Sequence, residues 1–556
     1  MTEYKTPGVY VEEISKFPPS VAGVATAIPA FIGVTENCPT KQPVRITSLL
    51  DFEEKFGYGP ELKVFAEKEE GKDEEHPITT TETGEGQGDE LEGEGDELEG
   101  QGDELLDDQG ENPEGGDVQG DDDEYLPGDD DEVNTPLRLM REEGETEFPT
   151  YKEKYTLKGK EFVLYDSIRL FYDNGGGVCY VASIGTYEDF KDSYPEWDND
   201  YIPVLNSLKN IDEVTLLLAP DAAMLLGDKL QDLQKKMLTQ CEELGDRFAI
   251  LDLIEEDELQ DTLKDFREGV TDHLSYGAAY YPNLISSYTK DIDFESVIIA
   301  LGGVPKILGK IEDTDTKKKE KLNKLFEGIE KCVTDDEKKL RIKAIIPQIP
   351  GYAEKLAELQ AEACVIPPSG AIAGIYAAND SSKGVWQAPA NVGIASISGL
   401  TRRLSDADQA DMNVDANTGK SVNAIRYFAG KGILVWGART LDGNSNEWRY
   451  VPVRRLFNYI EESVQKSTAW AVFQPNDANT WVKIQCQIEN FLNNLWRDGA
   501  LAGSSPEKAF YVKVGLDVTM TAADILAGYL IVEIGIAAVR PAEFIVLKFS
   551  HKLQEA

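Results

Sequence analysis

The stretches VTLLLAP (214–220) and RFAILDL (247–253) decide the fold class of this 556-residue chain. Both are short runs rich in apolar and β-branched residues, the composition of buried strands. The intervening AAMLLGDKLQDLQKKMLTQCEEL (222–244) has the pattern of a helix. Because parallel strands need a long crossover connection, this spacing predicts a βαβ unit. VCYVASI (178–184) is expected to add another strand, so we predict an α/β (α+β) fold.

Three further helices are expected outside this layer. TKKKEKLNKLFEGIEKC (316–332) reads as a charged amphipathic helix. RRLFNYIEESVQKSTAWAV (454–472) places Leu456, Ile460 and Val464 on one face. DANTWVKIQCQIENFLNNLWRDGAL (477–501) begins at a capping Asp or Asn. The last two helices are predicted to pack on a sheet.

An acidic segment interrupts the chain before the α/β layer. Residues 81–132 contain 24 Asp and Glu residues and no Lys or Arg, about half of the formal net charge of −47. GDEL recurs at 88, 95 and 102, but glycine and dense like charge oppose a helix there. We interpret the segment as a solvated insertion. Calcium binding by its carboxylates is the alternative, although GDELEGE lacks the order of an EF-hand loop.

Composition disfavours several classes of protein. The strong negative charge argues against nucleic acid as a partner. The six cysteines show no CxxC pair, so we expect free thiols and synthesis in a reducing compartment. MTEYKTPGVY shows no secretory signal, which predicts assembly in the cytoplasm. The most apolar candidate span, 522–540, carries three charged residues, so no membrane insertion is expected.

Searches for catalytic motifs nominate no site. DANTGKS (415–421) has the end of a P-loop, but Val414 stands where the first glycine is required. NGGGV (174–178) is expected to form a tight turn before a strand. The histidines at 76, 273 and 551 are isolated from one another. We therefore predict no catalytic, metal or cofactor site and no enzymatic activity, while an enzyme on the α/β layer stays open as an alternative.

Both tails of the chain have the alternation of β-strands. TPGVYVEEI (6–14) places Val9, Val11 and Glu13 on one face and Tyr10, Glu12 and Ile14 on the other. PAEFIVLKFSHKL (541–553) places Ile545, Leu547 and Phe549 on one face, with Phe544 and Val546 between them. Such strands either pair within their own molecule or offer unpaired backbone groups to another chain.

Eight phrases in one order resemble the contractile tail sheath family of contractile bacteriophages, R-type pyocins and phage-tail-like injection systems. They are YKTPGVYVEEIS, PPSVAGVATAIPAFIGVTE, VIPPSGAIAGIYAAND, GVWQAPAN, NAIRYFAGKGILVWGARTL, YVPVRRLFNYIEESV, VFQPND and PAEFIVLKF. The resemblance covers about residues 1–60 and 162–556. It does not extend to the acidic segment.

The resemblance implies a multi-domain subunit in which both chain ends meet in an inner C-terminal domain and an α/β domain is inserted between them. The expected segments are a linker strand at 1–20, the start of the sheath core at 21–60 and an acidic outer insertion at 61–160. A middle α/β domain (161–364), a C-terminal sheath domain (365–540) and a second linker strand (541–556) follow.

The resemblance also implies how subunits associate. An N-terminal and a C-terminal strand from neighbours join a two-stranded sheet in a third subunit, and the mapped linkers are residues 6–16 and 541–552. The partners implied are further copies in a helical homo-oligomer, an inner tube protein, a baseplate, and a tail terminator or cap. Polar residues within 454–497 are expected to face the tube, and a simple solvated helix face is the alternative. The favoured residues are Arg454, Arg455, Glu461, Glu462 and Lys466. A calcium-binding acidic surface or adhesion protein is the alternative function.

Overall fold

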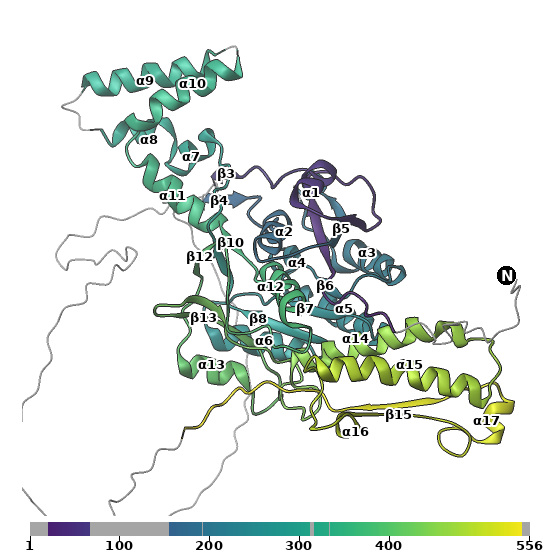
Figure 1. Cartoon of the computed structure of the whole chain (residues 1–556). Coiled ribbons are helices and arrows are strands. Elements are labelled where there is room, and N and C mark those ends of the chain that lie inside the picture. The colour runs from purple at the N-terminus through teal and green to yellow at the C-terminus, as the bar shows by residue number, and fades with distance from the viewer. Residues whose placement is uncertain (1–20, 67–154, 192, 312–315, 333, 548–556) are drawn as a thin grey trace, which may run out of the picture. The chain divides into compact units, whose positions relative to one another are not determined.

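A nine-stranded sheet organises the chain in the computed structural model, which describes residues 21–66, 155–191, 193–311, 316–332 and 334–547 (Figure 1). Its six central strands are parallel, and antiparallel strands complete both edges. From edge to edge the strands are β11 (Val392–Gly393), β14 (Gly432–Val435), β13 (Asn423–Phe428), β8 (Gly277–Tyr281), β7 (Phe248–Leu251), β6 (Leu216–Leu218), β1 (Pro29–Thr35), β5 (Cys179–Thr186) and β2 (Val44–Ile46).

The predicted βαβ unit is confirmed. β6 and β7 are parallel neighbours, and the chain between them forms α4 (Pro220–Leu225) and α5 (Leu230–Leu244). All residues of β6 and β7 are buried, because helices cover both faces of the sheet. α5 ends at Gly245, which adopts a left-handed conformation with φ of 69°.

Two apolar cores lie on opposite faces of this sheet. One packs against helices α3 (Ile202–Ser207), α4, α5, α6 (Leu259–Gly269) and α13 (Asp406–Asn413). The other packs against α1 (Leu49–Phe56), α2 (Leu164–Asp173) and α12 (Ser369–Lys383). A three-stranded sheet borders the second core and consists of β10 (Val365–Ile366), β9 (Leu284–Ser286) and β12 (Ile397–Leu400).

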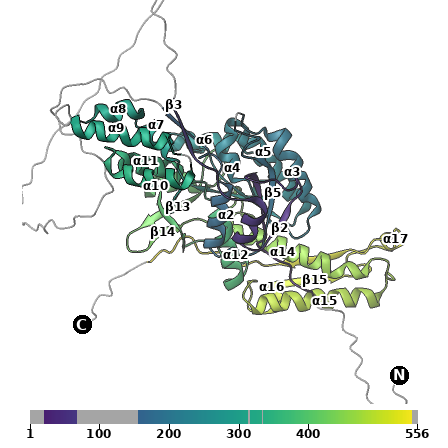
Figure 2. The same cartoon turned by 90° about the horizontal axis from the view of Figure 1, so that it is seen from above.

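A third core is almost entirely helical and includes the helix predicted at 316–332, which is α9 (Figure 2). The antiparallel pair of β3 (Lys63–Ala66) and β4 (Tyr155–Lys158) contributes Val64 and Leu157 to it. Its helices are α7 (Phe294–Ala300), α8 (Gly303–Gly309), α9 (Thr316–Glu330), α10 (Asp335–Ile345) and α11 (Tyr352–Ala363).

The fourth core joins the two long C-terminal helices to a small sheet. These helices are α14 (Val451–Thr468) and α15 (Ala478–Arg497), and the predicted cap of α15 is confirmed, since Asp477 accepts a hydrogen bond from the Thr480 N–H. β15 (Phe510–Val514) pairs antiparallel with β16 (Val532–Ile536) and lies beside α15 (Figure 1). The short helices α16 (Pro506–Ala509) and α17 (Ala522–Leu526) flank the sheet. Val21 is buried in the same core, so the described start of the chain meets its C-terminal part.

The boundary predicted at residue 365 does not divide the main sheet. β13 and β14 lie beyond that residue, yet β13 pairs with β8, and α12 packs on α2. Strand pairing therefore joins segments of the chain that lie on either side of residue 365. The six cysteines are free thiols, as predicted. In the described part of the chain, no helix is long and apolar enough to cross a membrane.

Candidate assembly interface

The N-terminal root, which we define as residues 21–28, lies along α14. Two of its backbone N–H groups donate to hydroxyls of this helix: Ala22 to Ser467 Oγ (3.3 Å) and Val24 to Ser463 Oγ (3.2 Å). The carbonyl of Thr26 accepts from Arg455 Nη2 at 2.7 Å. A Cβ on Gly23 would lie 2.1 Å from the Tyr459 hydroxyl oxygen, so any larger residue there would displace the Tyr459 side chain. The root is therefore fixed in position by side chains of α14.

The C-terminal root, which we define as Glu543, is bound by two side chains of the same chain. Its carboxylate accepts from Arg439 Nε (2.7 Å) and Nη2 (2.6 Å), a bidentate ion pair. The Tyr450 hydroxyl donates to the same carboxylate at 3.0 Å. Arg439 is 3% exposed, and its backbone N–H donates to Asn423 Oδ1 in β13. Glu543 is thus bound to the end of the main sheet.

The side chains that directly follow Glu543 are exposed. Phe544, Ile545, Val546 and Leu547 are 75, 80, 75 and 72% exposed, respectively. Within the described residues, this segment pairs with no strand of its own chain. The predicted C-terminal linker therefore presents apolar side chains to solvent as far as residue 547. Phe549 and the N-terminal linker residues Val9, Tyr10, Val11, Glu12 and Ile14 lie outside the described residues.

The sheet of β15 and β16 has two strands only, among the residues that the structure describes. Its register pairs Val512 with Ile534, and Val512 faces the core beneath it. Both outer edges lack a partner strand in the described part of the chain. A two-stranded sheet is marginal by itself, and its edges offer backbone donors and acceptors to further strands.

The predicted polar surface on α14 is wrong for three of its five residues. Arg454, Arg455 and Glu462 are only 4, 4 and 5% exposed. The Arg455 guanidinium donates to both Asp380 oxygens, at 3.1 and 2.5 Å. The sequence pattern shows one apolar face of α14, but a second face is also buried. That face is polar because it packs against Asp380 of α12 and the backbone carbonyls of Thr26 and Arg247.

The remaining two residues lie at the edge of that contact. Glu461 is about half exposed and accepts from Arg454 at 3.2 Å. Lys466 pairs with Glu462 (2.6 Å) and with Asp212 (2.9 Å) of the α/β layer. Burial raises the pKa of Glu462, while its hydrogen bond with Lys466 acts in the opposite direction. Contact of these residues with a tube stays a prediction.

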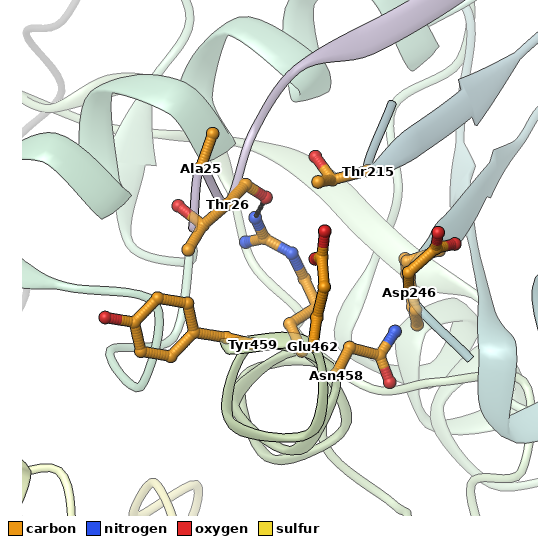
Figure 3. A pocket seen from close by; sticks show the side chains of 9 residues that line it. Ala25, Thr26, Thr215, Asp246, Asn458, Tyr459 and Glu462 are labelled. Carbon is orange, nitrogen blue, oxygen red and sulfur yellow. Dashed lines mark hydrogen bonds between the residues drawn. The ribbon is translucent and has the colours of Figure 1, made fainter. Parts of the chain in front are cut away.

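The contact between the N-terminal root, α14 and the sheet leaves a space of about 10 Å³. Figure 3 shows Thr26, Asn458 and Glu462 around it, with Asp246 on the sheet side. Asn458 Nδ2 donates to the Arg247 carbonyl at 3.1 Å, which ties α14 to the start of β7. The space has room for about one water molecule, so the contact is packed.

A carboxylate of the chain fills the place where open α/β sheets bind ligands. In such sheets, ligands bind at the carboxyl ends of two neighbouring strands whose connections run to opposite faces of the sheet. In this chain those strands are β1 and β6. The Asp221 side chain is fully buried there and accepts three backbone N–H bonds of 2.7 Å, from Val34, Val163 and Leu164. A Cβ on Gly33 would lie 2.5 Å from its Oδ2 atom. The donors that would hold an anion are already satisfied.

The pH dependence of stability follows from this burial. Burial raises the pKa of Asp221 from 3.8 to about 7, and the three N–H donors offset that only in part. Since the pKa is higher in the folded chain, the stability contributed by this group is complete below about pH 4 and is lost as the pH rises through about 7. Asp221→Asn removes the titration. The excess free energy of unfolding of wild type over this variant should therefore decrease between about pH 4 and pH 7 in urea melts. A constant difference would contradict this prediction.

The part of the chain that the structure describes contains no metal-binding cluster. No three His, Cys, Asp or Glu side chains there converge as metal ligands. Lys420 of the P-loop-like stretch is 7% exposed and donates to the Arg267 carbonyl. Gly175 of NGGGV has φ of 94° and precedes β5, which confirms the predicted turn. The acidic repeats lie outside the described residues, and calcium binding there stays a prediction.

The fold and the linker roots define a subunit with a multilayered α/β body and an exposed strand-like tail. Residues 444–552 match the model of the phage tail sheath C-terminal domain. The tail sheath protein of Vibrio phage KVP40 (isolate Vibrio parahaemolyticus/Japan/Matsuzaki/1991) is 28% identical over 130 residues, 23% of this chain. The chain spans only 19% of that relative's length in this match.

Solved sheath structures share the fold along nearly the whole chain. The PVC sheath complex of an extracellular contractile injection system, in the contracted state, has a TM-score of 0.53 and 24% identity over 99% of both chains. The contracted helical sheath of the anti-feeding prophage has a TM-score of 0.53 and 23% identity over 99% of this chain and 100% of that one. The predicted resemblance to contractile tail sheath proteins is confirmed, as is the α/β fold class.

Sequence reasoning missed the two roots. Nothing in PAEFIVLKF distinguishes Glu543 from any other solvent-facing carboxylate at a strand start. Ser463 and Ser467 recur four residues apart, which does place them on one helical face. That spacing was the available signal for a polar stripe that receives backbone N–H groups.

Proposed function

We propose that this chain is the structural subunit of a contractile sheath in a phage tail or phage-tail-like particle. It polymerises helically around an inner tube and contracts to drive the tube through a target envelope. The observation that carries this proposal is that the apolar segment 544–547 is exposed beyond a fixed root at Glu543. In addition, the β15–β16 sheet has open edges among the residues that the structure describes. The similarity of the fold to solved sheath structures also supports the proposal.

Strand exchange joins the subunits in this proposal. The N-terminal linker (6–16) and the C-terminal linker (541–552) of neighbours add strands to the β15–β16 sheet of a third subunit. Backbone hydrogen bonds provide the attachment, and alternate side chains fix the register. Because donor and acceptor surfaces differ, the contact is heterologous and propagates into a helical tube.

Contraction uses free energy stored at assembly rather than catalysis. Subunits assemble in an extended lattice, then rotate and repack into a shorter and wider one while the linkers keep them connected. A kinetic barrier preserves the extended state until the baseplate releases it. The inner tube, the baseplate and a cap or terminator are the partners in this scheme, and assembly takes place in the bacterial cytoplasm.

Deleting residues 1–17 tests the proposal. The deletion leaves the N-terminal root from residue 21 in place, so the subunit should fold. Negative-stain imaging is expected to show striated tubes for the full chain and none for the deletion. Equal tube formation by both would refute exchange of the N-terminal strand, and the absence of any polymer from the full chain with its tube would refute the sheath assignment.

A further inference from the structure

Both linker roots meet the same helix. Tyr450, the residue before the first turn of α14, donates to Glu543 of the C-terminal root. Ser463 and Ser467, near the other end of α14, accept from the N-terminal root. The seventeen positions from Tyr450 to Ser467 correspond to about 26 Å along a helix. One secondary-structure element therefore spans the distance between the points where the two linkers leave the body.

α14 is held on two sides, so it cannot shift independently of the body. Leu456 and Ile460 are buried in the core that it shares with α15 and β15. Its opposite face binds the main sheet and α12 through Asn458 and Arg455. A helix packed on both faces and anchored by ion pairs is a rigid element compared with the exposed tail beyond Glu543.

The C-terminal root separates a hydrogen-bonded segment from an exposed one. Upstream, the Ala537 and Val539 N–H groups donate to the carbonyls of Ala509 and Ala500, at 2.8 and 3.2 Å. Downstream, Phe544 is 75% exposed. Between them, Glu543 binds a buried arginine with both carboxylate oxygens. A length change upstream of Glu543 alters a surface loop, whereas a change downstream alters the linker itself.

We propose that α14 connects the two linkers mechanically and that Glu543, held by Arg439 and Tyr450, sets where the C-terminal linker begins. This inference rests on the proposed strand exchange. The separation of linker roots in each subunit is then a fixed length, and changes of lattice dimensions are confined to the segments outside the roots. Glu543 is a positioning residue in this scheme, since Arg439 and Tyr450 of its own subunit bind its carboxylate.

A matched pair of insertions tests the position of the root. Gly-Ser is inserted either between Arg540 and Pro541 or between Glu543 and Phe544. The two variants therefore have the same composition, and both keep the two-residue alternation of the strand. We expect the upstream insertion to give tubes with the wild-type axial repeat. The downstream insertion should reduce tube number by about tenfold or change the repeat, because it lengthens the linker by about 7 Å.

Glu543→Gln supplies the second readout. Loss of the ion pair should speed hydrogen–deuterium exchange in residues 537–543 by about tenfold while β15 and β16 keep their protection. In this background the two insertions should become equivalent. Tyr450→Phe keeps the charges and should give a smaller change, which guards against misfolding of the Gln variant. Glu243→Gln, in an exposed pair with Lys209, is the matched control and should leave exchange and assembly unchanged.

The outcomes separate the two proposals. Equal effects of the two insertions in the wild-type background, or unchanged exchange at residues 537–543 in Glu543→Gln, would overturn the role of Glu543 while leaving strand exchange intact. Failure of the unmodified chain to form tubes with its tube protein would instead remove the sheath function on which the inference rests.

Discussion

Removal of residues 544–556 is expected to leave a folded subunit that forms no sheath. The described part of this segment is 72–80% exposed and contributes no strand pairing to its own chain, so its loss removes little of the subunit's stability. In the lattice the same residues would supply a row of backbone hydrogen bonds and bury alternate apolar side chains, each worth about 1.5–3 kcal/mol. Thermal unfolding and negative-stain imaging measure the two effects separately.

A full-length variant controls for chain length. Ile545→Asp with Leu547→Asp keeps every backbone group of the tail but places charge on one face of the strand. Assembly should fail here as well, because the charged face would be buried in the acceptor sheet. Charge added at two exposed turn positions, Asn444→Asp and Asn446→Asp, should leave assembly unchanged. Normal tubes from the truncated chain would show that the C-terminal tail is not an exchanged strand.

Local patterns were sufficient to predict the elements of this fold. The apolar runs at 214–220 and 247–253 gave strands β6 and β7 because burial on both faces selects continuous apolar residues. The Asp at the start of 477–501 predicted the N-cap of α15, since capping is a contact within one turn. Such features depend on residues that are neighbours in sequence.

Contacts between distant segments could not be predicted in the same way. The carboxylate of Asp221 satisfies N–H groups of β1 and α2, which lie 187 and about 57 residues away in the chain. Arg455 reads as a solvent-facing residue of an amphipathic helix, and only the fold brings Asp380 and Thr26 to it. For the interface, the alternation of the tail predicted a strand but not its exposure, and its root at Glu543 was not predictable.

Replacing Arg455 by Met is expected to destabilise the subunit by about 3–5 kcal/mol, because it leaves Asp380 buried without its charged partner. The two side chains are 3 and 4% exposed, and the guanidinium also lies 4.6 Å from the Tyr376 ring centroid. The measurement is the free energy of unfolding in urea. Arg497→Met, at the exposed end of α15, is the control and should change stability by no more than about 0.5 kcal/mol.

A double variant separates the cost of an unpaired charge from the loss of packing. Arg455→Met combined with Asp380→Leu removes both charges, so it should be less destabilised than Arg455→Met alone. The double variant still lacks the donor to the Thr26 carbonyl and should retain a residual loss of about 1–3 kcal/mol from that unsatisfied group. If the double variant were less stable than the single one, the ion pair would not be the source of the effect. The source would then be the lost hydrogen bond to the Thr26 carbonyl in the N-terminal root. Hydrogen–deuterium exchange of residues 22–28 would be faster in both variants.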